Sequence, residues 1–225
     1  MSREKYDSLL TTSDSPNFDP TRDGFGFRNP VGEVPNRSGG GSLLRRFGAL
    51  LYGKGLCFGM SAVALLYFAD RTTDTRRPQL AELPLTPILL STLRKYHSRQ
   101  FWPRAVFASV WDWMASGGGR PEHVLERLCL PGASQDPHVL CFGPALNRRF
   151  LSCFLGAHAV VPYQVEGRRV YVYDPNHPGG RGRFVKFWRD NSSGSWEFAY
   201  GGFRSREGWG ITLVPMSVVG DRRTL

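Results

Sequence analysis

The sequence predicts an α+β fold in which helices come first and an antiparallel β-sheet follows. A run over 56–69 is apolar on nearly every side and long enough for a helix, which is typical of a buried helix. Three further helical patterns lie between residues 78 and 131, and from residue 150 the pattern changes to short β-type runs separated by Gly, Asn and Pro. Helices followed by strands favour α+β over a doubly wound parallel sheet.

The three shorter helices have recognisable start and stop signals. Thr86 is an N-cap residue with Pro87 at the first helical position, and this pattern runs to about residue 100. A second pattern over 103–116 ends at three glycines, and a third over 121–130 ends before a Pro-Gly pair. The predicted strands cover 157–165, 170–173, 183–188, 196–200 and 209–219.

The first 42 residues are rich in Ser, Thr, Asp, Asn, Gly and Pro, and we expect this leader to be flexible or draped over the domain. A short strand is expected near 24–30, where aromatic and small residues alternate. A single domain is expected over 43–219, with a helical lobe over about 43–131 and a β lobe over about 150–219. Residues 220–225 form a tail.

The composition of the 225 residues excludes several classes of protein. Four cysteines without a C-x-x-C pair exclude a disulfide-stapled scaffold and a zinc ribbon. The N-terminus lacks the apolar core of a signal peptide, and the run over 56–69 is too short to span a bilayer, so we expect a cytoplasmic protein. The net charge of +10 arises after residue 40. It favours binding of an anionic partner or an acidic substrate, and the alternative is a solvated basic surface.

Cys57 has the position of a nucleophile, because a turn containing Gly53 and Gly55 leads directly into the buried helix. A thiol in the first turn of a helix feels the positive end of the helix dipole and the free backbone N–H groups, which favour the thiolate. The alternative is that Cys57 is a small buried hydrophobic residue. We expect the other cysteines to be structural, since they lie near helix ends or in apolar surroundings: Cys129, Cys141 and Cys153.

His158 and Asp174 lie on two β runs that a Gly-containing loop joins into a hairpin. With a three-residue loop over 165–167, His158 is directly opposite Asp174, about 5 Å away at Cβ. A carboxylate there accepts the imidazole N–H and leaves the other ring nitrogen free for a thiol. A one-residue slip would send the two side chains to opposite faces. The alternatives are a core histidine and a turn-initiating Asp, but with Cys57 the two complete a Cys-His-Asp set.

Three segments carry these residues: Gly-Leu-Cys-Phe-Gly-Met over 55–60 at the start of a central helix, Ala-His-Ala-Val-Val over 157–161 on a strand, and Val-Tyr-Asp-Pro-Asn over 172–176 on the next. They resemble the papain-like fold of cysteine peptidases and their bacterial relatives, including the bacteriocin-processing type. The resemblance implies a two-lobed fold, with the Cys helix in the helical lobe and the His and Asp in the β lobe.

The same resemblance implies an activity. Cys57 would be the nucleophile, His158 the general base and then acid, and Asp174 the orienter of the histidine. The protein would be a cysteine-dependent hydrolase of peptide or amide bonds that forms a thioester acyl-enzyme, with a peptide, protein or other amide as substrate and no metal or organic cofactor.

The sequence departs from that family just before the nucleophile. Family members commonly have a Gln there that donates to the oxyanion, whereas residues 50–55 contain neither Gln nor Asn. The backbone N–H of Cys57 supplies one donor. The candidates for the second are Asn29 on the leader, followed by Tyr52 and Lys54. The departure leaves open a thiol acyltransferase or a deamidase with the same triad, and also an inactive relative.

Three alternatives concern other residues. Asn176 is the rival orienter of the histidine. A zinc site made of Cys153, His158 and His177 lacks a fourth ligand and a recognisable spacing. Outside enzymes, the alternative is a basic module that binds nucleic acid or an acidic partner, because the stretch 181–209 interleaves Arg and Lys with aromatic residues. Aromatic residues on strands, however, are more often core than a stacking platform.

Overall fold

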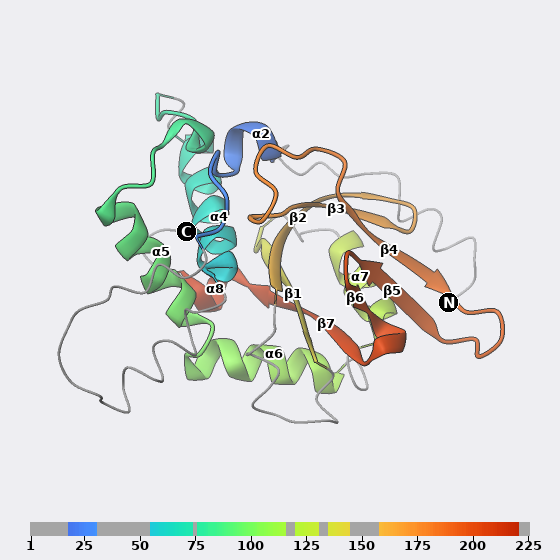
Figure 1. The fold of residues 1–225 in the computed structure, drawn as a ribbon. Coiled ribbons are helices and arrows are strands. Elements are labelled where there is room, and N and C mark those ends of the chain that lie inside the picture. The colour runs from blue at the N-terminus through green and yellow to red at the C-terminus, as the bar shows by residue number, and fades with distance from the viewer. Residues whose placement is uncertain are drawn as a thin grey trace, which may run out of the picture.

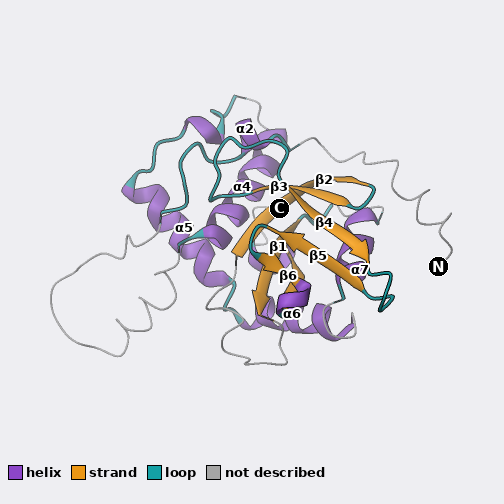
Figure 2. Ribbon diagram, turned by 45° about the vertical axis from the view of Figure 1, so that its right-hand side comes forward, coloured by secondary structure: helices purple, strands orange, loops and turns teal. Residues whose placement is uncertain are grey.

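A strongly curved antiparallel sheet forms one half of the protein, and helices pack against it (Figures 1 and 2). The computed structural model describes residues 18–30, 55–73, 76–115, 120–130, 135–144 and 158–220. The mixed α+β class predicted from the sequence is confirmed. The helices are α2 (Pro20–Asp23), α4 (Cys57–Thr73), η1 (Leu80–Glu82), α5 (Pro87–Arg99), α6 (Pro103–Ala115), α7 (Pro121–Cys129), η3 (Ser205–Glu207) and α8 (Met216–Val219).

The sheet contains seven strands in the order β6-β5-β4-β3-β2-β1-β7. Its edge strands β6 and β7 come close together, and the rings of Phe203 and Trp209 meet edge to face at 4.8 Å, so the sheet is nearly closed. The strands are β1 (His138–Pro144), β2 (His158–Glu166), β3 (Arg169–Tyr173), β4 (Phe184–Arg189), β5 (Trp196–Tyr200), β6 (Phe203–Arg204) and β7 (Trp209–Pro215).

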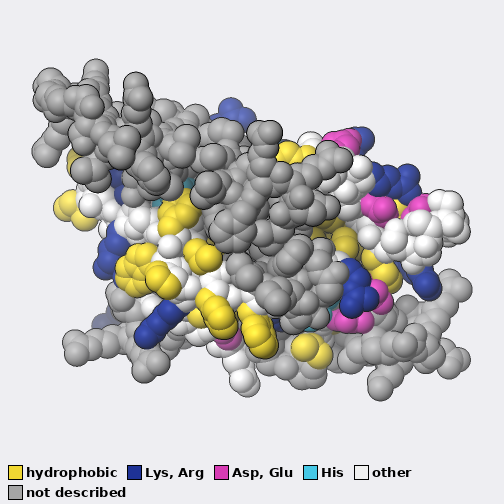
Figure 3. Space-filling model, turned by 90° about the horizontal axis from the view of Figure 1, so that it is seen from below, with side chains coloured by type: hydrophobic (Ala, Val, Ile, Leu, Met, Phe, Trp, Pro, Cys, Tyr) yellow, Lys and Arg dark blue, Asp and Glu magenta, His cyan; other side chains and the backbone are white. Residues whose placement is uncertain are grey.

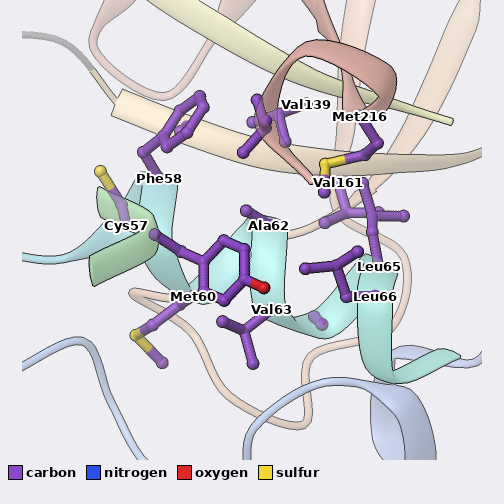
Figure 4. Packing of buried hydrophobic residues seen from close by; sticks show 14 of the residues in the cluster. Cys57, Phe58, Met60, Ala62, Val63, Leu65, Leu66, Val139, Val161 and Met216 are labelled. Carbon is purple, nitrogen blue, oxygen red and sulfur yellow. The ribbon is translucent and has the colours of Figure 1, made fainter. Parts of the chain in front are cut away.

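Helix α4 lies against one face of this sheet (Figure 1). Its apolar side chains face the strands, and Figure 4 shows Phe58 and Ala62 directed towards Val139 and Val161. The buried hydroxyl of Ser61 donates to the backbone oxygen of Ala159 at 3.2 Å. This bond fixes the helix to β2 one residue after His158.

The opposite, concave face of the sheet is filled by a second apolar cluster. Helix α7 closes it with Val124 and Leu125, both almost fully buried. The strands contribute Leu140, Phe142, Val160, Val170, Val172, Val185, Phe187, Phe198, Tyr200, Ile211 and Leu213. Burial of this much aliphatic and aromatic surface stabilises the curvature that brings β5 towards β2.

The hairpin of β2 and β3 differs from the predicted register. The turn contains two residues, with Gly167 in the left-handed region at φ 56°, and Glu166 pairs with Arg169. A bulge between Pro162 and Gln164 then shifts the register by one residue, so that Val161 pairs with Tyr173. Proline cannot donate to the ladder and is tolerated at such bulges.

The bulge decides which face His158 and Asp174 occupy. The two-residue turn alone would put them on opposite faces of the ladder, because the side-chain period is two. The extra residue at the bulge restores a common face. His158 is therefore a diagonal neighbour of Asp174, and the predicted direct pairing is wrong.

Three element predictions also need correction. Residues 24–30 contain no strand: the chain forms α2 and then an extended segment with bends. The predicted strand over 209–219 ends at Pro215, after which α8 begins. Strand β1 lies between the two predicted lobes, where the short apolar run over 139–142 was too brief to be distinguished from a loop.

The segment 18–30 packs into the fold as an integral part. Asp23 is 1% exposed and forms an ion pair with Arg71 of α4 at 2.8 Å. The backbone N–H of Phe25 donates to the hydroxyl of Tyr173 at 3.0 Å. The segment therefore connects the Cys57 helix with the end of β3.

Helix α6 carries two large aromatic side chains that are exposed. Phe107 and Trp111 on α6 are 67% and 63% exposed, and their rings stack on each other at 6.0 Å. Figure 3 views the molecule from below and shows apolar side chains gathered on this face. Over the described part of the chain, none of the helices is sufficiently long and apolar to cross a membrane.

Gly59→Ala tests the packing of α4. In an isolated helix this change is favourable by about 0.5–1 kcal/mol, but a Cβ at Gly59 would lie 2.1 Å from the backbone oxygen of Leu93 in α5. We expect a loss of about 1–3 kcal/mol in the free energy of unfolding, measured with urea. Gly202→Ala is the control, since nothing lies within 4 Å of a Cβ there; equal or greater stability of Gly59→Ala would contradict the packing.

Candidate active site

The structure brings together the three residues Cys57, His158 and Asp174. Cys57 is the first residue of α4, His158 is the first residue of β2, and Asp174 directly follows β3. The three residues are 7%, 6% and 2% exposed. The thiol lies close enough to His158 to raise the pKa of its imidazole, and Figure 4 shows the sulfur of Cys57 directed away from the apolar cluster.

The turn before Cys57 requires glycine. Gly55 has φ 101°, which L-residues with a side chain rarely adopt, and a Cβ there would lie 2.5 Å from the side-chain nitrogen of Asn29. The backbone oxygen of Leu56 accepts from the N–H of Met60, which starts the helix. Cys57 therefore lies in the first turn, where backbone N–H groups have no partner within the helix.

His158 contacts Asp174 through one ring nitrogen and two aromatic side chains through its ring. Its Nε2 is 2.9 Å from Oδ1 of Asp174. The ring stacks on Phe142, the β1 residue that pairs with His158, and on Phe203 of β6. The centroids of these rings lie 6.5 and 5.8 Å from the centroid of the imidazole. Because Nε2 is engaged by Asp174, Nδ1 is the ring nitrogen left for the thiol of Cys57.

The carboxylate of Asp174 accepts four hydrogen bonds. Oδ1 accepts from His158 and from the backbone N–H of Asn176 at 2.8 Å. Oδ2 accepts from the hydroxyl of Tyr200 and faces Nδ1 of His177 at 3.1 Å. A carboxylate with this many donors stays ionised although it is buried.

The charges of this cluster shift its pKa values. Burial lowers the pKa of His158, but the hydrogen bonds to Asp174 and Cys57 and the charges on both outweigh it and raise the pKa to about 10. Burial raises the pKa of Asp174, but the hydrogen bond and charge of His158, together with the Tyr200 and Asn176 donors, hold it well below its usual range. Burial and the Asp174 charge raise the pKa of Tyr200.

Asn29 and Asn176 both lie at this site. Asn29 is 6% exposed; its Oδ1 accepts from the backbone N–H of Leu56 at 2.6 Å, and its Nδ2 donates to Oδ1 of Asn176 at 2.9 Å. Nδ2 of Asn176 is 3.5 Å from Nδ1 of His158. Asn176 thus lies beside Nδ1, the ring nitrogen on the side of the thiol. Asp174 binds Nε2, the nitrogen that a residue orienting the histidine for reaction with a thiol would bind.

The remaining predicted residues have different positions. Tyr52, Lys54 and Cys153 lie outside the described residues. Cys129 is half-buried, and burial together with the charge of Glu126 raises its pKa to about 11. Burial, with a smaller contribution from Cys57, also raises the pKa of Cys141.

Tyr200 is the site residue that the sequence analysis missed. It lies on β5, three strands from β2 in the sheet, and reaches Asp174 only because the sheet curls back on itself. Its ring also stacks on Phe142 at 5.2 Å. No local pattern in the sequence marks this contact, because it depends on closure of the whole sheet.

Neither the alternative zinc site nor the alternative stacking platform for nucleic acid gains support from the described residues. In that part of the chain, no three His, Cys, Asp or Glu side chains gather in a way that could hold a metal ion, and both ring nitrogens of His158 face other groups. Three aromatic residues of the proposed stacking platform, Phe187, Phe198 and Tyr200, point into the core and cannot stack on bases.

Comparisons with protein-family models, with curated proteins and with solved structures give no significant match for this chain.

The interactions of His158 with Asp174 and Cys57 predict how stability depends on pH. The pKa of His158 is 6.5 without its partners and about 10 in the fold, so the contribution is fully present below about pH 6.5 and is lost as the pH rises through about 10. We expect the free energy of unfolding to fall by about 2–3 kcal/mol between pH 6.5 and 9. The comparison is His158→Gln, which keeps a donor but cannot titrate. If the free energy of unfolding, measured with urea, depended on pH in the same way for both proteins, these interactions would be contradicted.

Proposed function

We propose that the protein is a cysteine-dependent hydrolase of amide or peptide bonds. The observation that carries this proposal is the chain of contacts from Cys57, in the first turn of a helix, through His158 to the buried Asp174. A nucleophile, a base within hydrogen-bonding reach and a third group that orients the base form the arrangement of nucleophilic catalysis. The papain-like two-lobed fold suggested by the sequence resemblance is part of the same proposal.

The chemistry follows from these three positions. His158 accepts the proton of Cys57, and the sulfur attacks the carbonyl carbon of the substrate to give a tetrahedral oxyanion. The imidazolium then donates its proton to the leaving amine, the C–N bond breaks and a thioester to Cys57 remains. His158 next takes a proton from water, whose oxygen displaces the thiolate and releases the acid. Asp174 keeps the ring oriented and stabilises its positive charge in both halves.

The oxyanion needs donors that are in place before the reaction. The backbone N–H of Cys57 is one, since it lies among the N–H groups of the first helical turn that have no helical partner. Asn29 is the candidate for the second, because its Nδ2 carries two hydrogens and donates one of them to Asn176. Asn29 comes from a distant part of the chain and so takes the place of the Gln that is missing from 50–55.

The same three residues also support acyl transfer and deamidation. In a transferase an amine or hydroxyl replaces water in the second step, and in a deamidase the leaving group is ammonia. An inactive basic binding module remains the alternative outside catalysis. These functions differ in whether Cys57 is acylated and in what releases the acyl group.

Acylation of Cys57 by p-nitrophenyl acetate tests the proposal. We expect a burst of about one equivalent of p-nitrophenol and an added acetyl group on Cys57, located by mass spectrometry of peptides. Cys57→Ala should abolish the burst and leave the circular dichroism spectrum unchanged, and His158→Gln should slow it by about 10²-fold or more.

Cys129 provides an internal control. Its pKa of about 11 makes it a poor nucleophile near neutral pH, so it should stay unmodified while Cys57 reacts. Release of the acetyl group by water indicates a hydrolase, whereas faster release by added amines indicates a transferase. Acylation at equal, slow rates on all cysteines would contradict every version of the proposal that involves catalysis.

A further inference from the structure

Arg28 lies next to the Cys57 site on the packed segment 18–30. It precedes Asn29, whose side chain binds the backbone N–H of Leu56, one residue before the nucleophile. The Nε of Arg28 donates to the backbone oxygen of Asn176 at 2.9 Å. The side chain of Asn176 in turn reaches within 3.5 Å of His158. The guanidinium is therefore attached to the same residues that border the thiol and the imidazole.

Among the described residues, the bond to the backbone of Asn176 holds Arg28 through Nε and leaves its terminal nitrogens without a hydrogen bond. A guanidinium has five N–H donors, so the two terminal nitrogens keep four of them. The side chain is exposed, and these donors form the planar fork that binds a carboxylate with two parallel hydrogen bonds. A fork held at its base in this way loses little conformational freedom when it binds an anion.

The described carboxylates near Arg28 are already engaged elsewhere. Asp19 and Asp23, which lie on the same segment, form ion pairs with other arginines, and Asp174 is buried with four donors. Throughout the described ranges, no carboxylate forms an ion pair with Arg28. Arg28 therefore presents a positive charge beside the site that no described carboxylate pairs with, in a chain whose net charge is +10.

We infer that the site takes amide substrates that carry a carboxylate next to the scissile bond, and that Arg28 binds this carboxylate. The inference rests on the proposed function, since it names the substrate class of the same site. Bidentate binding at Arg28 would hold the substrate beside Asn176, whose side chain borders His158. Arg28 thus selects acidic substrates and takes no part in proton transfer.

Two alkylating reagents of almost equal size test this selection. Iodoacetate carries a carboxylate on the reactive carbon, and iodoacetamide carries a neutral amide in its place. With both, the sulfur of Cys57 forms a C–S bond and iodide leaves. The measured quantity is the ratio of the two second-order rate constants for Cys57 at low ionic strength, with the modified residue mapped by mass.

Arg28→Gln should lower the iodoacetate-to-iodoacetamide ratio by about three- to tenfold and leave the iodoacetamide rate unchanged. Lys186→Gln is the matched control, because it removes the same charge from an exposed position in the middle of β4 and should not change the ratio. Addition of salt should lower the wild-type ratio and have less effect on Arg28→Gln.

The outcomes separate the inference from the proposed function. Fast iodoacetamide labelling of Cys57 with the same ratio in Arg28→Gln and wild type would overturn the inference and leave the proposed function standing. An equal slowing with both reagents would also overturn it, since Arg28 would then support only the shape of the site. Slow labelling of Cys57 by both reagents in the wild type would overturn the proposed function itself.

Discussion

The buried carboxylate of Asp174 is the constraint on which the rest of the site depends. An ionised group that is 2% exposed is strongly destabilising unless donors surround it. Its donors come from the start of β2, from β5 and from its own turn: His158, Tyr200, Asn176 and His177. The hydroxyl of Tyr200 can reach Asp174 only because the sheet is curved, so the orientation of His158 is coupled to closure of the sheet. The geometry of the site therefore depends on all the strands from β2 to β5.

Asn29 has a comparable structural role on the side of Cys57. It links the turn before Cys57 with the turn after Asp174 through two side-chain hydrogen bonds. The ion pair of Asp23 with Arg71 and the bond from Phe25 to Tyr173 hold the segment that carries it. The N-terminal segment is thus structurally required for the site, and it also brings a cation, Arg28, to its edge.

The sequence predicted what depends on local pattern. The helix that starts at Cys57 and the strand that starts at His158 follow from local runs of apolar residues and their stop signals. The register of the β2–β3 hairpin was predicted wrongly, because the hairpin has a two-residue turn and a bulge in place of the expected three-residue loop. Pro162 in the strand was a sequence signal for the bulge. Tyr200 could not be predicted, since its contact with Asp174 spans the closed sheet.

The titration of His158 is the sharpest test of the Cys57–His158–Asp174 arrangement, because the pKa of His158 reports both the Asp174 carboxylate and the neighbouring thiol. Nitrogen-15 NMR of the five histidines across pH, with His158 assigned by the His158→Gln variant, gives this value. We expect a pKa of about 10 for His158 in the wild type and a lower pKa in Asp174→Asn. A pKa close to 6.5 in the wild type, unchanged in Asp174→Asn, would contradict the arrangement.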